Sequence, residues 1–132
     1  MDIRVTSTVF QVFASDLTGS LNFYRLLGLP VPDSDGPHVA VELPGGNTLS
    51  FDNEETIVAM HPNWAPPSSS EPRLALAFGA STAGEVDALY EKITAAGYSG
   101  LSQPYDAPWG QRYATVADPD GNWVDLFAPL SS

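Results

Sequence analysis

The sequence predicts an α+β fold in which the order β-α-β-β-β occurs twice within one domain, residues 1–132. Two amphipathic helix signals stand at corresponding places in the two halves, and each follows an apolar segment and precedes further strand signals. A Pro- and Ser-rich seam separates the halves. We expect one module over about 1–60, the seam over about 61–72 and a second module over about 73–132. A half of roughly 65 residues buries too little surface alone, so the modules should pack together, within a chain or across a dimer.

The first module is predicted around a helix from about Thr18 to Leu27. Ser15, Asp16 and Thr18 offer N-cap oxygens, and Gly28 is suited to the left-handed residue that ends a helix. A tight turn at Gly45-Gly46-Asn47 joins the last two strands. The strands expected in this module are Val5–Ala14, His38–Leu43 and Thr48–Asp52.

The second module is predicted around a helix from about Ala83 to Ala96. Thr82 and Glu85 have the spacing of a capping box, and Gly97 ends the helix. Asp118-Pro119-Asp120-Gly121-Asn122 predicts a hairpin turn, because Pro fixes one dihedral angle and Gly or Asn accepts a positive one. The strands expected in this module are Leu74–Gly79, Arg112–Ala117 and Trp123–Ala128.

Composition excludes several classes of protein. Sixteen acidic residues against five basic ones give a net charge of -11, which disfavours a nucleic-acid partner because phosphate contacts need clustered Lys and Arg. No apolar run reaches the roughly 20 residues of a membrane span. The chain has no cysteine, so disulfides, thiolate metal sites and cysteine nucleophiles are excluded. We therefore expect no membrane contact and a cytoplasmic location.

Three motifs resemble the vicinal oxygen chelate superfamily, which includes glyoxalase I, extradiol dioxygenases, fosfomycin-resistance transferases and bleomycin-resistance proteins. They are the stretch from Asp16 to Leu29, then Pro108-Trp109-Gly110, then Asp118 to Asn122. The resemblance implies two βαβββ modules whose curved sheets enclose a cleft, in a homodimer with or without exchange of modules. The segments Ala107–Ala114 and Val124–Leu130 look most similar to mitomycin-binding resistance proteins.

The same resemblance says where the metal ligands of the family's enzymes should lie. Those positions fall on Val9, Arg73 and Asp125, and a further glyoxalase ligand falls near Ser50. Valine has no donor atom and arginine is a permanent cation, so one carboxylate remains where three or four ligands are needed. We therefore predict a protein without metal or cofactor that is not an enzyme, with Arg73 neutralising Asp125. The remaining metal option combines His38, Glu42 and Asp125.

Strand alternation predicts which side chains face the cleft. In this prediction Val9, Gln11 and Phe13 face it from the first strand, and Trp123, Asp125 and Phe127 from the last. Stacking on Trp109 and His38 would supply affinity, carboxylates would meet ligand amines, and Arg112 could bond a carbonyl. The residues predicted to contact ligand are His38, Glu42, Phe51, Trp64, Tyr105, Trp109, Arg112 and Asp125.

These features together predict non-catalytic sequestration of a planar antibiotic, neutral or cationic, of the mitomycin, bleomycin or quinoxaline-peptide type, which would confer resistance or self-protection. The first alternative is an enzyme of the same fold: a metal-dependent lyase, glutathione transferase or dioxygenase, or a metal-free acid-base catalyst. The second alternative is a protein partner or chaperone for a biosynthetic assembly. Stoichiometric metal would favour the first alternative, and co-purification with a larger enzyme the second.

Overall fold

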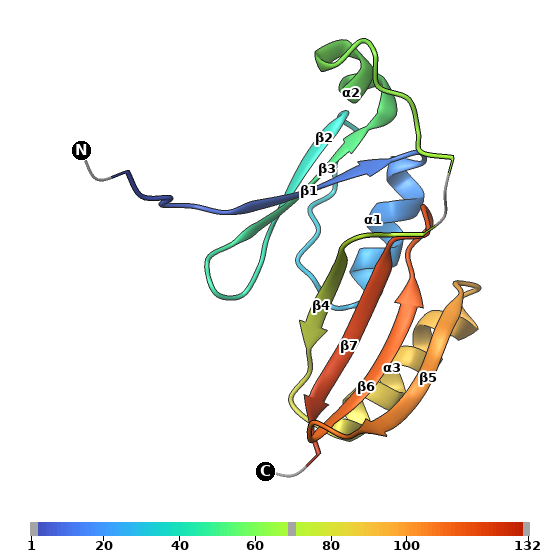
Figure 1. Ribbon diagram of the computed structural model, residues 1–132. Helices are drawn as coiled ribbons and strands as arrows, with labels where there is room; N and C mark the ends of the chain where they lie inside the picture. The colour runs from blue at the N-terminus through green and yellow to red at the C-terminus, as the bar shows by residue number, and fades with distance from the viewer. Residues whose placement is uncertain (1–2, 69–70, 131–132) are drawn as a thin grey trace. The chain divides into compact units, whose positions relative to one another are not determined.

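The computed structural model describes residues 3–68 and 71–130, so Ser69 and Ser70 of the expected seam lie outside the described residues. The chain divides into two compact units, Met1–Pro66 and Pro67–Ser132, with the boundary inside the Pro- and Ser-rich segment. We call them module 1 and module 2. Each has its own sheet, of three and four strands respectively, which confirms an α+β fold (Figure 1). No helix in the described ranges has the length and apolar character needed to cross a bilayer.

Module 1 has one three-stranded sheet with the order β1-β3-β2. Strand β1 pairs parallel to β3, and β2 pairs antiparallel to it. The elements are β1 (Val9–Ala14), α1 (Leu17–Leu26), β2 (His38–Glu42), β3 (Thr48–Asn53) and α2 (Glu54–Met60).

Helix α1 begins and ends within one residue of the predicted bounds, and Asp16 is the N-cap among the three predicted candidates. The Asp16 side chain accepts a hydrogen bond from the Gly19 N–H at 3.2 Å, and Gly28 has φ +83° beyond the C-terminus. Phe23 and Tyr24 are fully buried, and their rings meet edge to face at 4.9 Å. These rings form the centre of the module 1 core.

The expected repeat is complete only in module 2. The described part of module 1 has three strands rather than four, because residues 29–35 form no regular structure and β3 leads into helix α2. Pro30 and Pro32 lack the N–H that a strand ladder needs. The Asn53 side chain accepts from the Thr56 N–H at 2.9 Å, so it caps a helix at this point. The first strand also begins at Val9, later than the predicted Val5.

Module 2 contains the full βαβββ order in a sheet with the order β4-β7-β6-β5. Helix α3 packs on one face of this sheet through Val86 and Ile93, which are fully buried (Figure 1). The elements are β4 (Ala75–Gly79), α3 (Ala83–Ala95), β5 (Gly100–Ala107), β6 (Gln111–Ala117) and β7 (Trp123–Pro129).

The predicted hairpin turn between β6 and β7 is confirmed. The Asp118 carboxylate accepts from the backbone N–H groups of Asp120 and Asn122, each at 2.9 Å, and Gly121 takes a positive φ of 83°. This turn fixes the register of β6 on β7, in which Thr115 lies opposite Asp125.

The predicted strand alternation is also confirmed. In β2 the buried residues are Val39 and Val41, and in β7 they are Val124, Leu126 and Ala128. The intervening side chains lie on the opposite face of each sheet. We call this second face the open face of the module.

Candidate functional site

Four aromatic side chains gather on the open face of module 2. The Trp109 ring lies edge to face with Tyr105, at 6.4 Å between centroids, and with Tyr113, at 5.4 Å. Tyr113 in turn stacks on Phe127 at 6.5 Å. We call Tyr105, Trp109, Tyr113 and Phe127 the aromatic cluster. Trp109 is 57% exposed although its indole N–H donates to Gln111 Oε1 at 2.8 Å, so one hydrogen bond fixes a ring that stays open to a ligand.

A polar network lies beside the aromatic cluster. The Asp125 carboxylate accepts hydrogen bonds from the Tyr113 hydroxyl at 2.5 Å and the Thr115 hydroxyl at 2.9 Å. Burial first, and then the bond to the Asp125 carboxylate, raise the pKa of Tyr113 to about 12. The phenol therefore stays protonated at neutral pH and donates permanently to Asp125.

The raised pKa gives a testable pH dependence. Because the folded pKa lies above the ordinary value of 10.0, the Tyr113 phenol stabilises the fold fully below about pH 10 and loses this effect as pH rises toward 12. We expect an ultraviolet titration to contain a tyrosine step near pH 12, and Tyr113→Phe to remove that step. Asp125→Asn should lower the pKa of Tyr113 only in part, because burial remains. Wild-type and Tyr113→Phe curves that differ only by an ordinary tyrosine would contradict this assignment.

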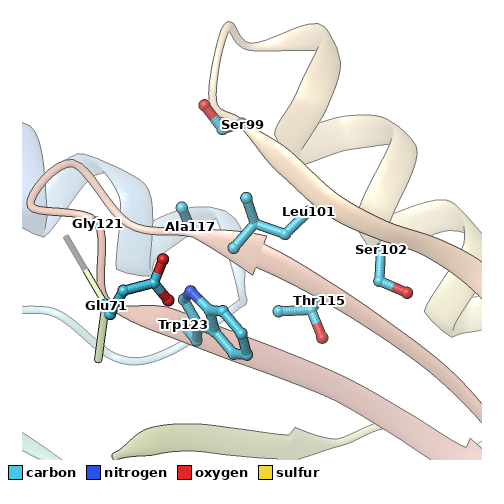
Figure 2. Close-up of a pocket in the computed structure, with 8 residues that line it drawn as sticks. All are labelled: Glu71, Ser99, Leu101, Ser102, Thr115, Ala117, Gly121 and Trp123. Carbon is cyan, nitrogen blue, oxygen red and sulfur yellow. The ribbon is translucent and has the colours of Figure 1, made fainter. Parts of the chain in front are cut away.

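A pocket opens on the same module, between β5, β6 and β7 (Figure 2). Its volume is about 480 Å³, which lies within the usual range of about 300–1,000 Å³ for small-molecule sites. The indole of Trp123 forms one wall, Leu101 faces it from β5, and the Glu71 carboxylate lies near the indole (Figure 2). The lining residues are Glu71, Ser99, Leu101, Ser102, Thr115, Ala117, Gly121 and Trp123.

Sequence reasoning placed Trp123 on this face but missed the rest of the pocket. The missing wall is β5, whose pairing with β6 shifts register between Gly100 and Ser102 and again between Ser102 and Tyr105. Because proline is rare inside β-strands, Pro104 makes this segment resemble a loop in the sequence, although an edge strand tolerates proline. Thr115 lines the pocket and bonds Asp125, so it connects the pocket to the polar network.

The open face of module 1 brings His38 next to Asp52. Phe13, Asp52 and His38 lie opposite one another on β1, β3 and β2, so they form one row across the sheet. The His38 Nδ1 lies 2.6 Å from an Asp52 oxygen, and the Gln11 amide donates to the other oxygen at 2.7 Å. Trp64 packs edge to face on Phe13 at 5.8 Å. Predicted residues His38 and Trp64 therefore both belong to this face, and Glu42 is exposed at the end of β2.

Two predicted ligand contacts and one predicted ion pair are corrected by the structure. Phe51 lies on the buried face of β3 and is fully buried against Tyr24, so its ring belongs to the core. Arg112 points to the helix side of its sheet, where it pairs with Asp87 at 2.9 Å and Asp106 at 2.8 Å. These carboxylates raise the pKa of Arg112. Arg73 is exposed, and among the described residues no ion pair joins it to Asp125, whose hydrogen bonds come from two hydroxyl groups.

The residues at the expected metal positions do not fit a metal ion. Val9 offers no donor atom, and Asp125 already accepts two hydroxyl hydrogen bonds. Within residues 3–68 and 71–130, no three His, Asp or Glu side chains are grouped in a way that could hold a metal. The ligand count therefore falls below the three or four protein groups that a divalent ion requires.

The protein-family model for the Glyoxalase/Bleomycin resistance protein/Dioxygenase superfamily matches residues 6–126 of the sequence. The chain belongs to this superfamily. This agrees with the vicinal oxygen chelate motifs seen in the sequence. No curated protein matches the chain.

Solved structures of this superfamily share the fold. A family enzyme from Burkholderia phytofirmans PsJN aligns with a TM-score of 0.81 at 21% identity, covering 93% of this chain and 98% of that one. A glyoxalase/bleomycin resistance protein/dioxygenase from Nocardioides is 27% identical, with a TM-score of 0.70, and the alignment covers 100% of this chain and 88% of that one. TioX from Micromonospora sp. ML1 aligns with a TM-score of 0.62 at 18% identity, and the alignment covers 96% of this chain and 100% of that one.

Proposed function

We propose that this superfamily member is a non-catalytic binding protein that sequesters a planar antibiotic, in the manner of mitomycin-binding resistance proteins, and so protects its host. The observation that carries the proposal is the exposed Trp109 ring at the edge of the aromatic cluster. Tyr105 offers a further ring face on module 2, and Trp64 and His38 offer ring faces on module 1. Sequestration requires affinity without turnover, which suits a chain whose expected metal positions offer a single carboxylate, Asp125, instead of three or four ligands.

The carboxylates of the two open faces restrict the kind of ligand. On these faces Asp52 and Asp125 each hold two hydrogen bonds from neighbouring side chains, and Asp106 pairs with Arg112 on the helix side of the module 2 sheet. These groups therefore position neighbouring side chains rather than standing ready for a ligand amine. Stacking would supply most of the affinity, and Glu42 is an exposed carboxylate that could meet a cationic substituent. We further propose that the protein acts as a homodimer.

Tryptophan fluorescence tests the proposal directly, because Trp64, Trp109 and Trp123 all lie on or beside the surfaces described above. The panel contains mitomycin, bleomycin, a quinoxaline peptide and an anthracycline, with the methylglyoxal–glutathione adduct as the enzyme control. We expect saturable quenching by at least one planar drug at one equivalent per chain. No quenching by any drug, or conversion of the adduct, would contradict the proposal and favour an enzyme.

Metal removal gives a separate expected result. Because the metal positions lack a ligand set, EDTA-treated and untreated protein should bind the same drug with the same dissociation constant. Elemental analysis of the purified protein should show Fe, Mn, Ni and Zn far below one equivalent per chain. Stoichiometric metal, or binding that EDTA abolishes and added metal restores, would show that the donor set has been misassigned.

A further inference from the structure

We propose that the pocket between β5, β6 and β7 is a second binding site, which takes a small organic ammonium ion: a protonated primary or secondary amine on a compact apolar group. The site goes beyond the proposed function, because no member of the aromatic cluster is among the described residues that line this pocket. From Tyr113, in the aromatic cluster, to Ala117, in the pocket, β6 advances four residues, which is about 13 Å at roughly 3.3 Å per residue. The two surfaces can therefore be tested separately.

The side-chain groups with a fixed hydrogen-bonding role in this pocket are acceptors. The Thr115 hydroxyl has one proton and donates it to Asp125 at 2.9 Å, so only the lone pairs of this oxygen remain for a ligand. The ionised carboxylate of Glu71 can also only accept. A ligand that brings hydrogen-bond donors therefore matches both groups.

Backbone donors beside the pocket are already engaged. The Ala117 N–H donates to the Ser99 carbonyl and the Gly121 N–H donates to the Asp118 carbonyl, each at 2.9 Å. Among the described residues that line the pocket, none is Lys, Arg or His. An anion would therefore meet no cationic side chain in this lining, whereas a cation would meet the Glu71 carboxylate.

The indole of Trp123 adds a second attraction for positive charge. Trp123 is 42% exposed, and the Glu71 carboxylate lies near its indole (Figure 2). The face of an indole ring attracts cations more strongly than the rings of Tyr or Phe do. An ammonium group over this ring would face the negative surface of the ring and a carboxylate at the same time.

The other walls of the pocket favour an organic cation over a metal ion. Leu101 faces the indole from β5, and Ala117 adds a further apolar surface (Figure 2). A hydrated metal ion gains nothing from apolar walls, and the one carboxylate of Glu71 is too few ligands for a divalent ion. An ammonium group on a compact apolar group matches both kinds of wall. The pocket volume of about 480 Å³ suits a small molecule of this kind.

Cyclohexylmethylammonium and cyclohexylmethanol are a matched pair of probes. They have the same shape, differ in charge, and lack a flat ring that could stack on Trp109. We expect the wild-type chain to bind the ammonium at least about tenfold more tightly, because cation–π contact and charge-assisted hydrogen bonds add to apolar burial. The readout is the Trp123 indole N–H signal in an NMR titration, assigned by its loss in Trp123→Phe. Equal affinity for the two probes, or no shift of this signal with the ammonium, would overturn the inference.

Two variants of the pocket test which groups recognise the charge. Glu71→Gln keeps the shape of an exposed side chain and removes its charge, so it should weaken ammonium binding about fivefold or more and leave alcohol binding unchanged. Trp123→Leu keeps an apolar wall without a π face, so in calorimetry it should lose most of the preference for the ammonium. A preference that survives in both variants would overturn the inference.

Glu55→Gln is the matched control, because it makes the same change of charge at an exposed residue of α2 in module 1. It should leave the affinity for both probes unchanged. If Glu55→Gln and Glu71→Gln weakened ammonium binding equally, the net charge of the chain would explain the attraction, and the pocket would not be a site.

A planar drug without an amine distinguishes this site from the proposed function. Saturating cyclohexylmethylammonium should leave the dissociation constant of such a drug unchanged, because the aromatic cluster and the pocket are separate surfaces. Competition between the drug and the ammonium would overturn the claim of a second site. Ammonium binding that depends on Glu71, together with no binder in the drug panel, would support this inference and contradict the proposed function.

Discussion

Replacing Trp109 with alanine is expected to weaken binding of the sequestered drug by more than about tenfold, with the fold unchanged. The indole is 57% exposed, so its removal leaves no cavity in the core. A ligand stacked on it loses an aromatic pair, worth about 0.5–1.5 kcal/mol, together with the apolar area that the pair buries. The dissociation constant, measured by calorimetry so that the readout does not depend on Trp109 itself, checks this result.

Trp109→Phe is the matched control for that variant. It removes the hydrogen bond to Gln111 but keeps an aromatic face toward Tyr105 and Tyr113, so it should retain most of the affinity. Circular dichroism and thermal unfolding should be the same for both variants and the wild type. An unchanged dissociation constant in Trp109→Ala would contradict the stacking account.

Phe51→Ala should act on stability instead, and strongly. Phe51 is fully buried against Tyr24, with ring centroids 4.9 Å apart. Truncating a buried phenylalanine typically costs about 3–5 kcal/mol, because apolar contacts are lost and a cavity remains. That is a large part of the roughly 5–15 kcal/mol by which domains are stable, so we expect a much lower midpoint in chemical denaturation.

The control for Phe51→Ala is Phe10→Ala, which makes the same chemical change at a ring that is 42% exposed. Its cost in free energy of unfolding should be clearly smaller. If Phe51→Ala left stability unchanged but weakened drug binding, Phe51 would be a ligand contact after all, and the assignment of the buried face of β3 would be wrong.

The sequence predicted well those helices whose ends carry clear capping residues. Asp16, Thr82 and the glycines Gly28 and Gly97 act through neighbouring backbone groups, so the helix ends could be read from the sequence. The alternation of apolar residues in β2 and β7 likewise determines which face is buried.

Elements without such signals were missed. Strand β5 contains a proline and two register shifts, and its pairing with β6 depends on partners distant in sequence. Helix α2 was not predicted, although Asn53, Glu54 and Glu55 form an N-terminal signal.

The sequence predicted which residues lie at the candidate site better than it predicted what each of them contacts. Alternation placed His38 and Asp125 on the open faces correctly. It could not show that Tyr113 and Thr115 bond Asp125, or that Gln11 and His38 share Asp52, because side-chain partners across strands depend on register. The same limit made Arg112 look like a ligand contact, although it pairs with Asp87 on α3.

Family membership leaves the activity open, since one fold can host both enzymes and binders. What argues for a binder is the chemistry of particular positions. Val9 falls at a position where the resemblance implies a metal ligand in the family's enzymes, and the Asp125 carboxylate accepts hydrogen bonds from Tyr113 and Thr115. Aromatic rings cover the same open face.

The fate of the ligand tests the central claim most directly. A drug that quenches tryptophan fluorescence should be incubated in molar excess over the protein chain, released by denaturation, and compared with the starting compound by mass spectrometry. The account predicts that the drug is recovered unchanged and in full after prolonged incubation. Conversion of the drug to a product at more than one equivalent per chain would show that the protein is a catalyst and would contradict sequestration.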